Sequence, residues 1–89
     1  MQSKNKKTMT ASERRHVALV KELPCAVCDK AGPSEAHEIK QGHYFTSIAL
    51  SVDCHRGPNG IHGDKTLWKI YKMDELDALN ETLRRLAGG

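Results

Sequence analysis

Residues 25–62, CAVCDKAGPSEAHEIKQGHYFTSIALSVDCHRGPNGIH, decide the fold of this chain. The stretch contains all three cysteines of the chain and four of its five histidines. Thiolates bind borderline-soft ions, and imidazoles suit zinc and several transition metals, so this concentration of ligands is typical of a metal-binding domain. We therefore predict that residues far apart along this stretch converge on metal ions.

The length and composition of the chain predict one small domain. A chain of 89 residues buries only about 60–65% of its unfolded surface, and here 38% of the residues are hydrophobic and 4% aromatic. A bound metal ion can supply the missing stability, because its binding free energy becomes folding free energy. We expect residues 1–9 to be a flexible basic tail and residues 10–89 to form the domain.

Charge and cysteine usage restrict the compartment and the partners. An odd number of cysteines with no apolar signal segment predicts a reducing, cytoplasmic location, and no apolar run reaches the about 20 residues that span a bilayer. The net charge of +3 fits a nucleic-acid partner, although the basic N-terminal part could also be a solvated tail. The candidate phosphate-contacting residues are Lys4, Lys6, Lys7, Arg14, Arg15 and Arg56.

The first pair of candidate ligands is Cys25-Ala-Val-Cys28, which follows Pro24. This spacing in a tight turn aims two thiolates at one ion, as in a zinc knuckle. A redox dithiol has the same spacing, but it usually heads a helix, and Gly32-Pro33 breaks any helix that starts here. The sequence therefore favours the zinc knuckle.

The second half of the cysteine site is Ser51-Val-Asp-Cys54, which keeps the knuckle spacing but has serine first. A neutral hydroxyl is a poor zinc ligand, so Cys25, Cys28 and Cys54 are the candidate ligands of a weakly held structural Zn²⁺. The fourth ligand stays open between His43, a neighbouring acid and water. Without metal, the cysteines would pack as small apolar residues.

Local signals predict helices on both sides of a hairpin. A capping box, Thr10-Ala-Ser-Glu13, opens a helix to about Glu22 that carries His16 as a surface or packing residue. Residues 36–40 and 46–51 are candidate strands of a hairpin or an Ω-like connection, and Gly57-Pro58-Asn59-Gly60 interrupts the helical segment that follows.

The C-terminal part should contain two further helices. Asp64 is the candidate N-cap of a helix that carries residues 67–71. The last helix starts near Asp74, and we expect its leucines to face the core. These leucines are Leu76, Leu79, Leu83 and Leu86.

Several short motifs, taken together, resemble one nuclease family. They are Cys25-Ala-Val-Cys28, Glu35-Ala-His-Glu-Ile39, Phe45-Thr46, Ile48-Ala-Leu50, Asp53-Cys-His-Arg-Gly57, Gly60-Ile-His-Gly63, Trp68 and Glu75-Leu-Asp-Ala-Leu-Asn80. Across residues 23–86 the chain resembles the phage-borne Ref-type HNH nucleases, which are associated with the recombinase RecA. The resemblance implies an α+β fold, in which a small ββα-metal finger is flanked by an N-terminal helix and C-terminal helices.

The resemblance also implies an activity, cofactors and partners. It implies a metal-dependent DNA endonuclease in the bacterial host cytosol, with a role in phage recombination and a RecA-type recombinase as a possible partner. His37, His55 and His62 would hold a divalent ion such as Mg²⁺, Mn²⁺ or Zn²⁺, with His37 and His62 among the catalytic residues. In the alternative interpretation, His55 or His62 completes the cysteine site.

The expected general base differs from the family pattern. The family has His-His-Ile where this chain has His37-Glu38-Ile39, and a solvated glutamate is a weaker base than imidazole near neutral pH. Three hypotheses follow: Glu38 is the base with a raised pKa, His37 is the base, or the centre is impaired. A non-catalytic zinc-finger module that binds DNA or a recombination partner is the rival function. The oligomeric state stays open.

Overall fold

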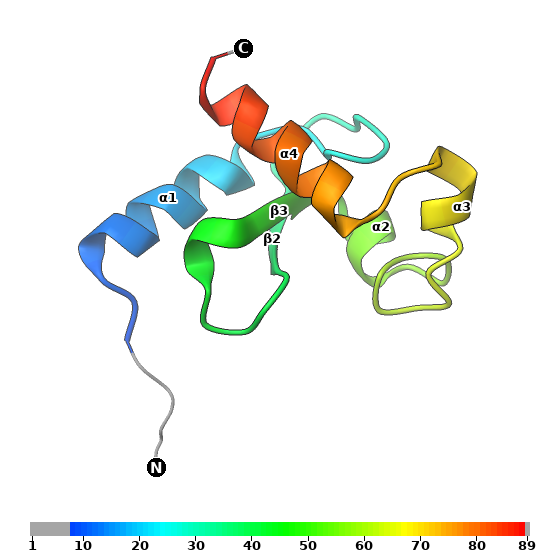
Figure 1. Cartoon of the computed structure of the whole chain (residues 1–89), viewed down its shortest axis with the longest axis horizontal. Coiled ribbons are helices and arrows are strands. Elements are labelled where there is room, and N and C mark those ends of the chain that lie inside the picture. The colour runs from blue at the N-terminus through cyan, green and yellow to red at the C-terminus, as the bar shows by residue number, and fades with distance from the viewer. Residues whose placement is uncertain (1–7, 89) are drawn as a thin grey trace.

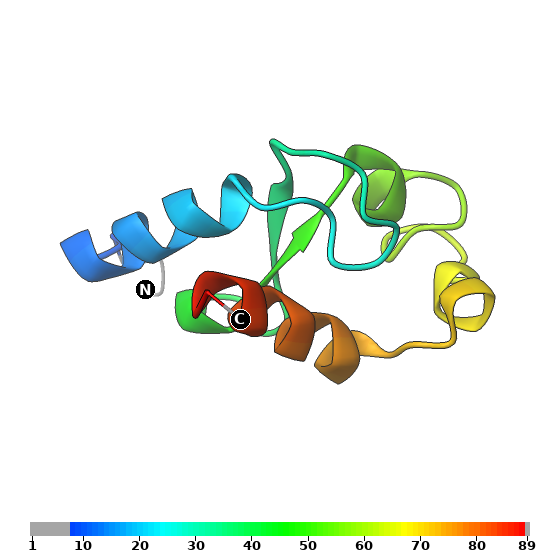
Figure 2. The ribbon, with the colours of Figure 1, turned by 90° about the horizontal axis from the view of Figure 1, so that it is seen from above.

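The computed structural model describes residues 8–88, so the candidate phosphate contacts Lys4, Lys6 and Lys7 and most of the expected flexible tail lie outside the described residues. The described chain is a small α+β structure with four α-helices and one antiparallel sheet of two strands. The elements are α1 (Ala11–Lys21), β2 (Glu35–Glu38), the 3-10 helix η1 (Tyr44–Thr46), β3 (Ser47–Leu50), α2 (Val52–Arg56), α3 (Leu67–Tyr71) and α4 (Glu75–Leu86). Both ribbon views show α1 and α3 at opposite ends of the molecule, with the sheet and α4 between them (Figures 1 and 2).

The pairing of the two strands determines which face of the sheet each side chain of β2 occupies. His37 pairs with Ile48 and Glu38 pairs with Ser47. Because side chains alternate along a strand, His37 and Glu38 point to opposite faces of the sheet. The first strand ends at Glu38, two residues before the predicted end, because the Glu38 carboxylate accepts a hydrogen bond from Gly42 N at 2.8 Å and closes the turn.

The caps of the two long helices confirm their predicted starts. Thr10 and Glu13 form a capping box before α1, and Asp74 and Asp77 form one before α4. Asp64, by contrast, is not the N-cap of α3, because the cap position is Thr66. The Asp64 carboxylate instead accepts hydrogen bonds from the backbone and hydroxyl of Thr66, which lowers the pKa of Asp64.

The predicted leucine stripe of α4 describes the buried face only in part, because Leu79 is buried and two other leucines are exposed. Leu76 is 70% exposed and Leu83 is 38% exposed, whereas Ala78, Leu79 and Thr82 are buried. Small side chains on this face let α4 lie close to β3, where the Thr82 hydroxyl accepts a hydrogen bond from Ala49 N at 3.3 Å. The buried face of α4 therefore contains one leucine of the stripe together with an alanine and a threonine.

The core is small and includes two of the candidate metal ligands. Its buried members are Cys25, Ala26, Ile48, Leu50, Cys54, Ile61, Leu67, Ala78 and Leu79. His16 lies outside it and packs against Phe45, with ring centroids 5.2 Å apart, as expected for a packing histidine. Among the described residues, no helix has the length and apolar character that would span a membrane.

Candidate metal centres

Three histidines from separate segments converge on one point, which we call the histidine centre. His37 comes from β2, His55 from α2 and His62 from the loop that follows α2. Nδ1 of His37 lies 3.3 Å from Nε2 of His55, and Nε2 of His62 lies 3.2 Å from the same atom. His37 is buried and His62 is exposed, so the centre opens to solvent on one side.

The loop after α2 brings His62 to His55 by folding back onto the end of the helix. Ile61 N donates to Cys54 O at 2.9 Å, and His62 N donates to His55 O at 3.1 Å. These bonds satisfy carbonyl groups that a helix end leaves free. The close approach requires Gly60, because a Cβ atom there would lie 2.6 Å from Cys54 O. The glycine-rich interruption in the sequence is therefore the element that delivers the third histidine.

Two carboxylates hold the imidazoles of the histidine centre from behind. Nδ1 of His55 lies 2.7 Å from Oε1 of Glu35, and Nε2 of His37 lies 3.3 Å from Oε2 of Glu75. Arg56 in turn holds Glu35 through its Nε and Nη2 atoms, and with His55 it lowers the pKa of Glu35. Carboxylates behind metal-ligating histidines commonly fix the ring orientation and the tautomer.

The tautomers that these carboxylates select leave unprotonated nitrogens facing each other. A carboxylate only accepts, so the nitrogen of His37 or His55 that faces it carries the proton. Nδ1 of His37 and Nε2 of His55 therefore both present lone pairs, although they are only 3.3 Å apart. A cation between them resolves this repulsion. A shared proton is disfavoured, because burial lowers the pKa of His37 despite the opposing effect of Glu75.

The separations of these nitrogens fit a bound metal ion. Two nitrogen ligands at about 2.0–2.1 Å from a tetrahedral zinc ion lie about 3.3–3.4 Å apart. The separations at the histidine centre are 3.2 and 3.3 Å. Three imidazoles leave at least one coordination position open, as in metal sites that activate a ligand.

The three cysteines form a second cluster, which we call the cysteine centre. The sulfurs of Cys25, Cys28 and Cys54 all lie within 4.8 Å of one another. Sγ of Cys25 accepts hydrogen bonds from the backbone N–H groups of Val27 and Cys28, both at 3.4 Å, as expected for a knuckle turn. Both clusters could hold a metal ion, and the structure gives no identity for either ion.

Ser51 takes the place of the fourth cysteine at this centre. Its Oγ lies 3.6 Å from Sγ of Cys28 and accepts a hydrogen bond from Cys54 N at 3.3 Å, which repeats the bond between Cys28 N and Cys25. Sulfur at about 2.3 Å and oxygen at about 2.0–2.2 Å from a tetrahedral zinc ion lie about 3.5–3.7 Å apart. The serine hydroxyl is therefore positioned as a fourth ligand, whereas His43 is exposed and lies outside both clusters.

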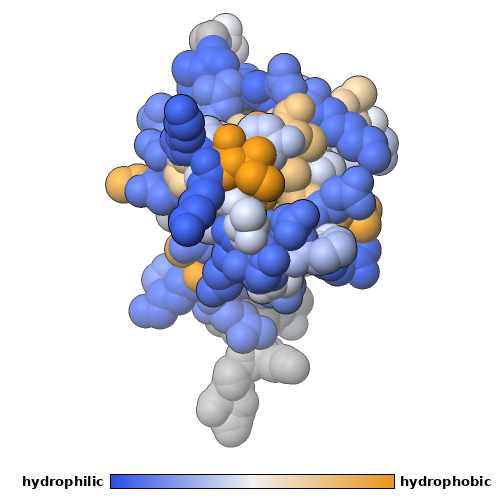
Figure 3. All heavy atoms as spheres, turned by 90° about the vertical axis from the view of Figure 1, so that its right-hand side faces the viewer, coloured by the Kyte–Doolittle hydropathy of each residue, from blue (hydrophilic) through white to orange (hydrophobic). Residues whose placement is uncertain are grey.

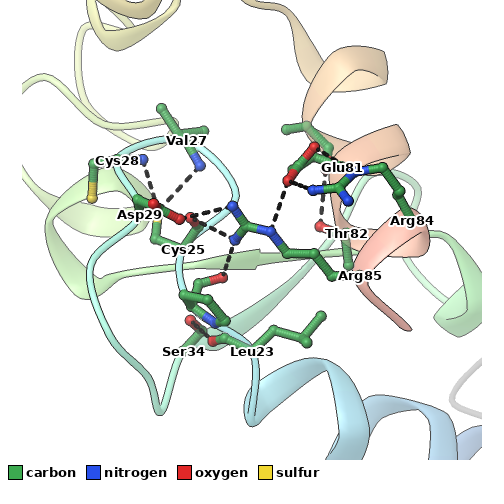
Figure 4. A network of polar contacts seen from close by, with 12 residues as sticks. Leu23, Cys25, Val27, Cys28, Asp29, Ser34, Glu81, Thr82, Arg84 and Arg85 are labelled. Carbon is green, nitrogen blue, oxygen red and sulfur yellow. Dashed lines mark hydrogen bonds and ion pairs between the residues drawn. The ribbon is translucent and has the colours of Figure 1, made fainter. Parts of the chain in front are cut away.

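Arg85 of α4 fastens the knuckle turn of the cysteine centre from outside (Figure 4). Its Nη1 atom lies 3.4 Å from the carbonyl oxygens of Pro24 and Cys25, and its Nη2 atom donates to Asp29 at 2.7 Å. Its Nε atom donates to Glu81 one turn earlier on the same helix, also at 2.7 Å. The C-terminal helix thus braces the turn that presents Cys25 and Cys28.

The environments of the buried thiols push their pKa values apart. Burial raises the pKa of Cys25, but hydrogen bonds from the backbone of Cys28, Ser51 and Val27 outweigh it and lower the value from 9.0 to about 7. Burial raises the pKa of Cys54, and the neighbouring Cys25 sulfur raises it further. Without a cation, Cys25 therefore ionises before Cys54, because a second charge next to the Cys25 thiolate is unfavourable.

The structure separates the predicted site residues into two groups. His55 and His62 join His37, so neither completes the cysteine site as the alternative interpretation proposed. The Glu38 carboxylate lies outside the histidine cluster and binds Gly42 N. Among the basic candidates, Arg15 is exposed on α1, Arg14 donates to Met9 O at 2.7 Å, and Arg56 holds Glu35.

Sequence reasoning assigned no role to Glu35, Glu75 or Arg85. Glu35 has a usable signal, because it is two residues before His37 and a strand places both on one face. Glu75 and Arg85 are far from their partners in sequence, so only the packing of α4 reveals them. No protein-family model, no curated protein and no solved structure matches this chain.

Proposed function

We propose that this chain is a metal-dependent DNA endonuclease of the HNH type that hydrolyses phosphodiester bonds. The observation that carries the proposal is the convergence of ring nitrogens of His37, His55 and His62, with separations of 3.3 and 3.2 Å. Such a centre favours the binding of a cation and leaves a coordination position free for a phosphate oxygen. A structural Zn²⁺ at the cysteine centre belongs to the same proposal.

The order of the elements supports the proposal. Two antiparallel strands, β2 and β3, lead directly into α2, and His37 and His55 lie on the first strand and on the helix. This is the plan expected of a ββα-metal finger, and the histidines are those that the family resemblance selects. The proposed association with a RecA-type recombinase and with phage recombination rests on that resemblance alone.

The residues of the histidine centre have separable tasks. A bound divalent ion would stabilise charge on the phosphate and on the leaving oxygen. His37, His55 and His62 would hold it, and Glu35 and Glu75 orient two of the rings. The side chain of Arg56 is 61% exposed, so it can contact a phosphate while it holds Glu35.

The position of Glu38 makes the proposed activity weak. Its carboxylate is engaged by Gly42 N in the hairpin turn, and it projects from the face of β2 opposite to His37. An imidazole at residue 38 must leave the turn to reach the centre. If it does so, the replacement Glu38→His should raise nicking of plasmid DNA in Mg²⁺ or Mn²⁺. Unchanged nicking in this variant would remove residue 38 as the place of the base.

The test of the proposal is metal-dependent conversion of supercoiled plasmid to nicked circles. His62→Ala should abolish nicking, whereas His43→Ala should not, because His43 is an exposed histidine outside the centre. Retained nicking in His62→Ala, or equal loss in both variants, would contradict the proposal.

The engagement of Glu38 also favours a second candidate, a non-catalytic zinc-finger module that binds DNA. That module would hold metal and shift DNA in a gel, but neither the parent chain nor Glu38→His would nick it. The same plasmid assay therefore separates the two functions.

A further inference from the structure

A hollow of about 400 Å³ lies beside the histidine centre, between the loop after α2, α3 and the start of α4. It is lined by Ile61, Lys65, Trp68, Asp74, Glu75 and Leu76. Two of these residues connect it to the centre. Glu75 also contacts Nε2 of His37, and Ile61 directly precedes His62. The hollow therefore adjoins the centre, next to the ring of His37 and to the residue before His62.

The walls of the hollow are apolar and aromatic, and its polar groups are mostly acceptors. Trp68, Leu76 and Ile61 provide the apolar surface, while Asp74 and Glu75 provide carboxylate oxygens. Oε1 of Glu75 does not take part in the contact with His37, which uses Oε2. A phosphate would be repelled by two carboxylates, whereas a flat aromatic ring with N–H groups on its edge fits such walls.

On the side of the molecule where α3 lies, apolar side chains interrupt a hydrophilic surface (Figure 3). Leu76, a hydrophobic residue of α4, is 70% exposed. Lys65 supplies a cation among the lining residues. Its backbone N–H donates to Gly60 O at 3.0 Å, so it belongs to the same turn that delivers His62.

We propose that the hollow receives an unpaired base of the DNA strand, next to the phosphate that binds at the histidine centre. The inference rests on the proposed nuclease function and adds its substrate class, a strand with unpaired bases. The base would stack on Trp68 and Leu76 and donate its edge N–H groups to Asp74 or Glu75. A base within a duplex cannot enter, because both of its faces are stacked and its edge is paired.

Trp68 is the single tryptophan of the chain, so its fluorescence reports on the hollow without any labelling. A short single-stranded DNA oligonucleotide of mixed sequence should quench this fluorescence, and the blunt duplex of the same sequence should not. The titration is made with His62→Ala in the presence of Zn²⁺, so that the cysteine centre keeps its ion while cleavage is abolished. Equal quenching by both forms, or none by the single strand, would overturn the inference.

A matched pair of variants tests whether the hollow itself binds the strand. Leu76→Glu places a charge on its wall, whereas Ile70→Glu places the same charge on α3 at a residue that is 59% exposed and does not line the hollow. Both side chains are exposed, so both variants should fold. Leu76→Glu should weaken single-strand binding at least about fivefold, as loss of one stacking contact does, and Ile70→Glu should not. Equal affinities of the two variants would also overturn the inference.

The two proposals fail in different ways. Selective quenching by single strands, without nicking of any DNA by the parent chain, would retain the hollow as a base-binding site and remove the nuclease function. Metal-dependent nicking without quenching would retain the nuclease and remove the base-binding site.

Discussion

The cysteine centre and the histidine centre each bring side chains from separate segments to one point, but the first lies in the core and the second opens to solvent. Cys25 and Cys54 are core residues with exposed fractions of 0% and 7%, and backbone N–H groups and Arg85 hold the turn that carries Cys25. The histidine centre lies at the surface, and carboxylates rather than backbone groups orient its rings. A closed site stabilises a fold, whereas an open site can bind a further ligand.

This difference predicts that the two centres contribute to different properties. Metal at the cysteine centre should determine whether the small core is stable, because that core contains two of its ligands. Metal at the histidine centre should determine chemistry, with little effect on the fold.

The largest expected effect separates the two centres by stability. Cys25→Ser removes a buried ligand, and we expect it to lower the free energy of unfolding by several kcal/mol, because the binding energy of the structural ion is lost. His62→Ala removes an exposed ligand outside the core and should lower the free energy of unfolding by less than Cys25→Ser does. Urea denaturation of both variants in Zn²⁺ measures the difference. Similar midpoints for the two variants would contradict the claim that the cysteine centre, and not the histidine centre, stabilises the fold.

The second largest effect tests the role of the carboxylates that orient the histidine rings. Glu35→Gln removes the charged partner of His55 and should weaken metal binding at the histidine centre about 10–100-fold. Glu38→Gln changes an acid on the same strand that lies outside the centre, so it is the matched control. Calorimetric titration with Mn²⁺ gives both affinities. A loss of affinity in the control equal to that in Glu35→Gln would show that the strand, rather than the carboxylate, is responsible.

The third effect concerns the serine at the cysteine centre. Ser51→Cys supplies a thiolate at a position that already lies 3.6 Å from Sγ of Cys28. We expect tighter zinc binding and a thermal midpoint about 4–8 °C higher, which corresponds to about 1 kcal/mol in a domain of this size. Competition with a zinc-binding dye and thermal denaturation provide the measurements. An unchanged midpoint at full zinc occupancy would contradict the idea that Ser51 occupies the fourth ligand position.

The smallest effect is a pH dependence of the metal-free protein. Burial lowers the pKa of His37 in the folded chain below its ordinary value of 6.5. As the pH falls through that ordinary value, the unfolded chain takes up a proton that folded His37 resists, so stability falls. Urea denaturation in EDTA at about pH 7.5 and about pH 5.5 should show this loss in the parent chain and less of it in His37→Asn. A parent chain that is equally stable at both values contradicts it.

The sequence predicted the ligands better than the surfaces that surround them. The spacing of the cysteines predicted the cysteine cluster, and the family resemblance singled out the three histidines of the other cluster. The capping boxes at Thr10 and Asp74 located two helix starts for a similarly local reason. The buried face of α4 and the partners Glu75 and Arg85 depend on how α4 crosses the sheet. Periodicity alone predicted that Leu76 faces the core, whereas it lines the hollow.

The central claim is that one chain holds two ions in two chemically different sites. Titration of the metal-free protein with Co²⁺, followed by absorption spectroscopy, tests it most directly. We expect two bound equivalents, one with sulfur-to-metal charge-transfer bands that Cys25→Ser removes, and one without them that His62→Ala removes. A single equivalent, or two that both depend on Cys25, would contradict it.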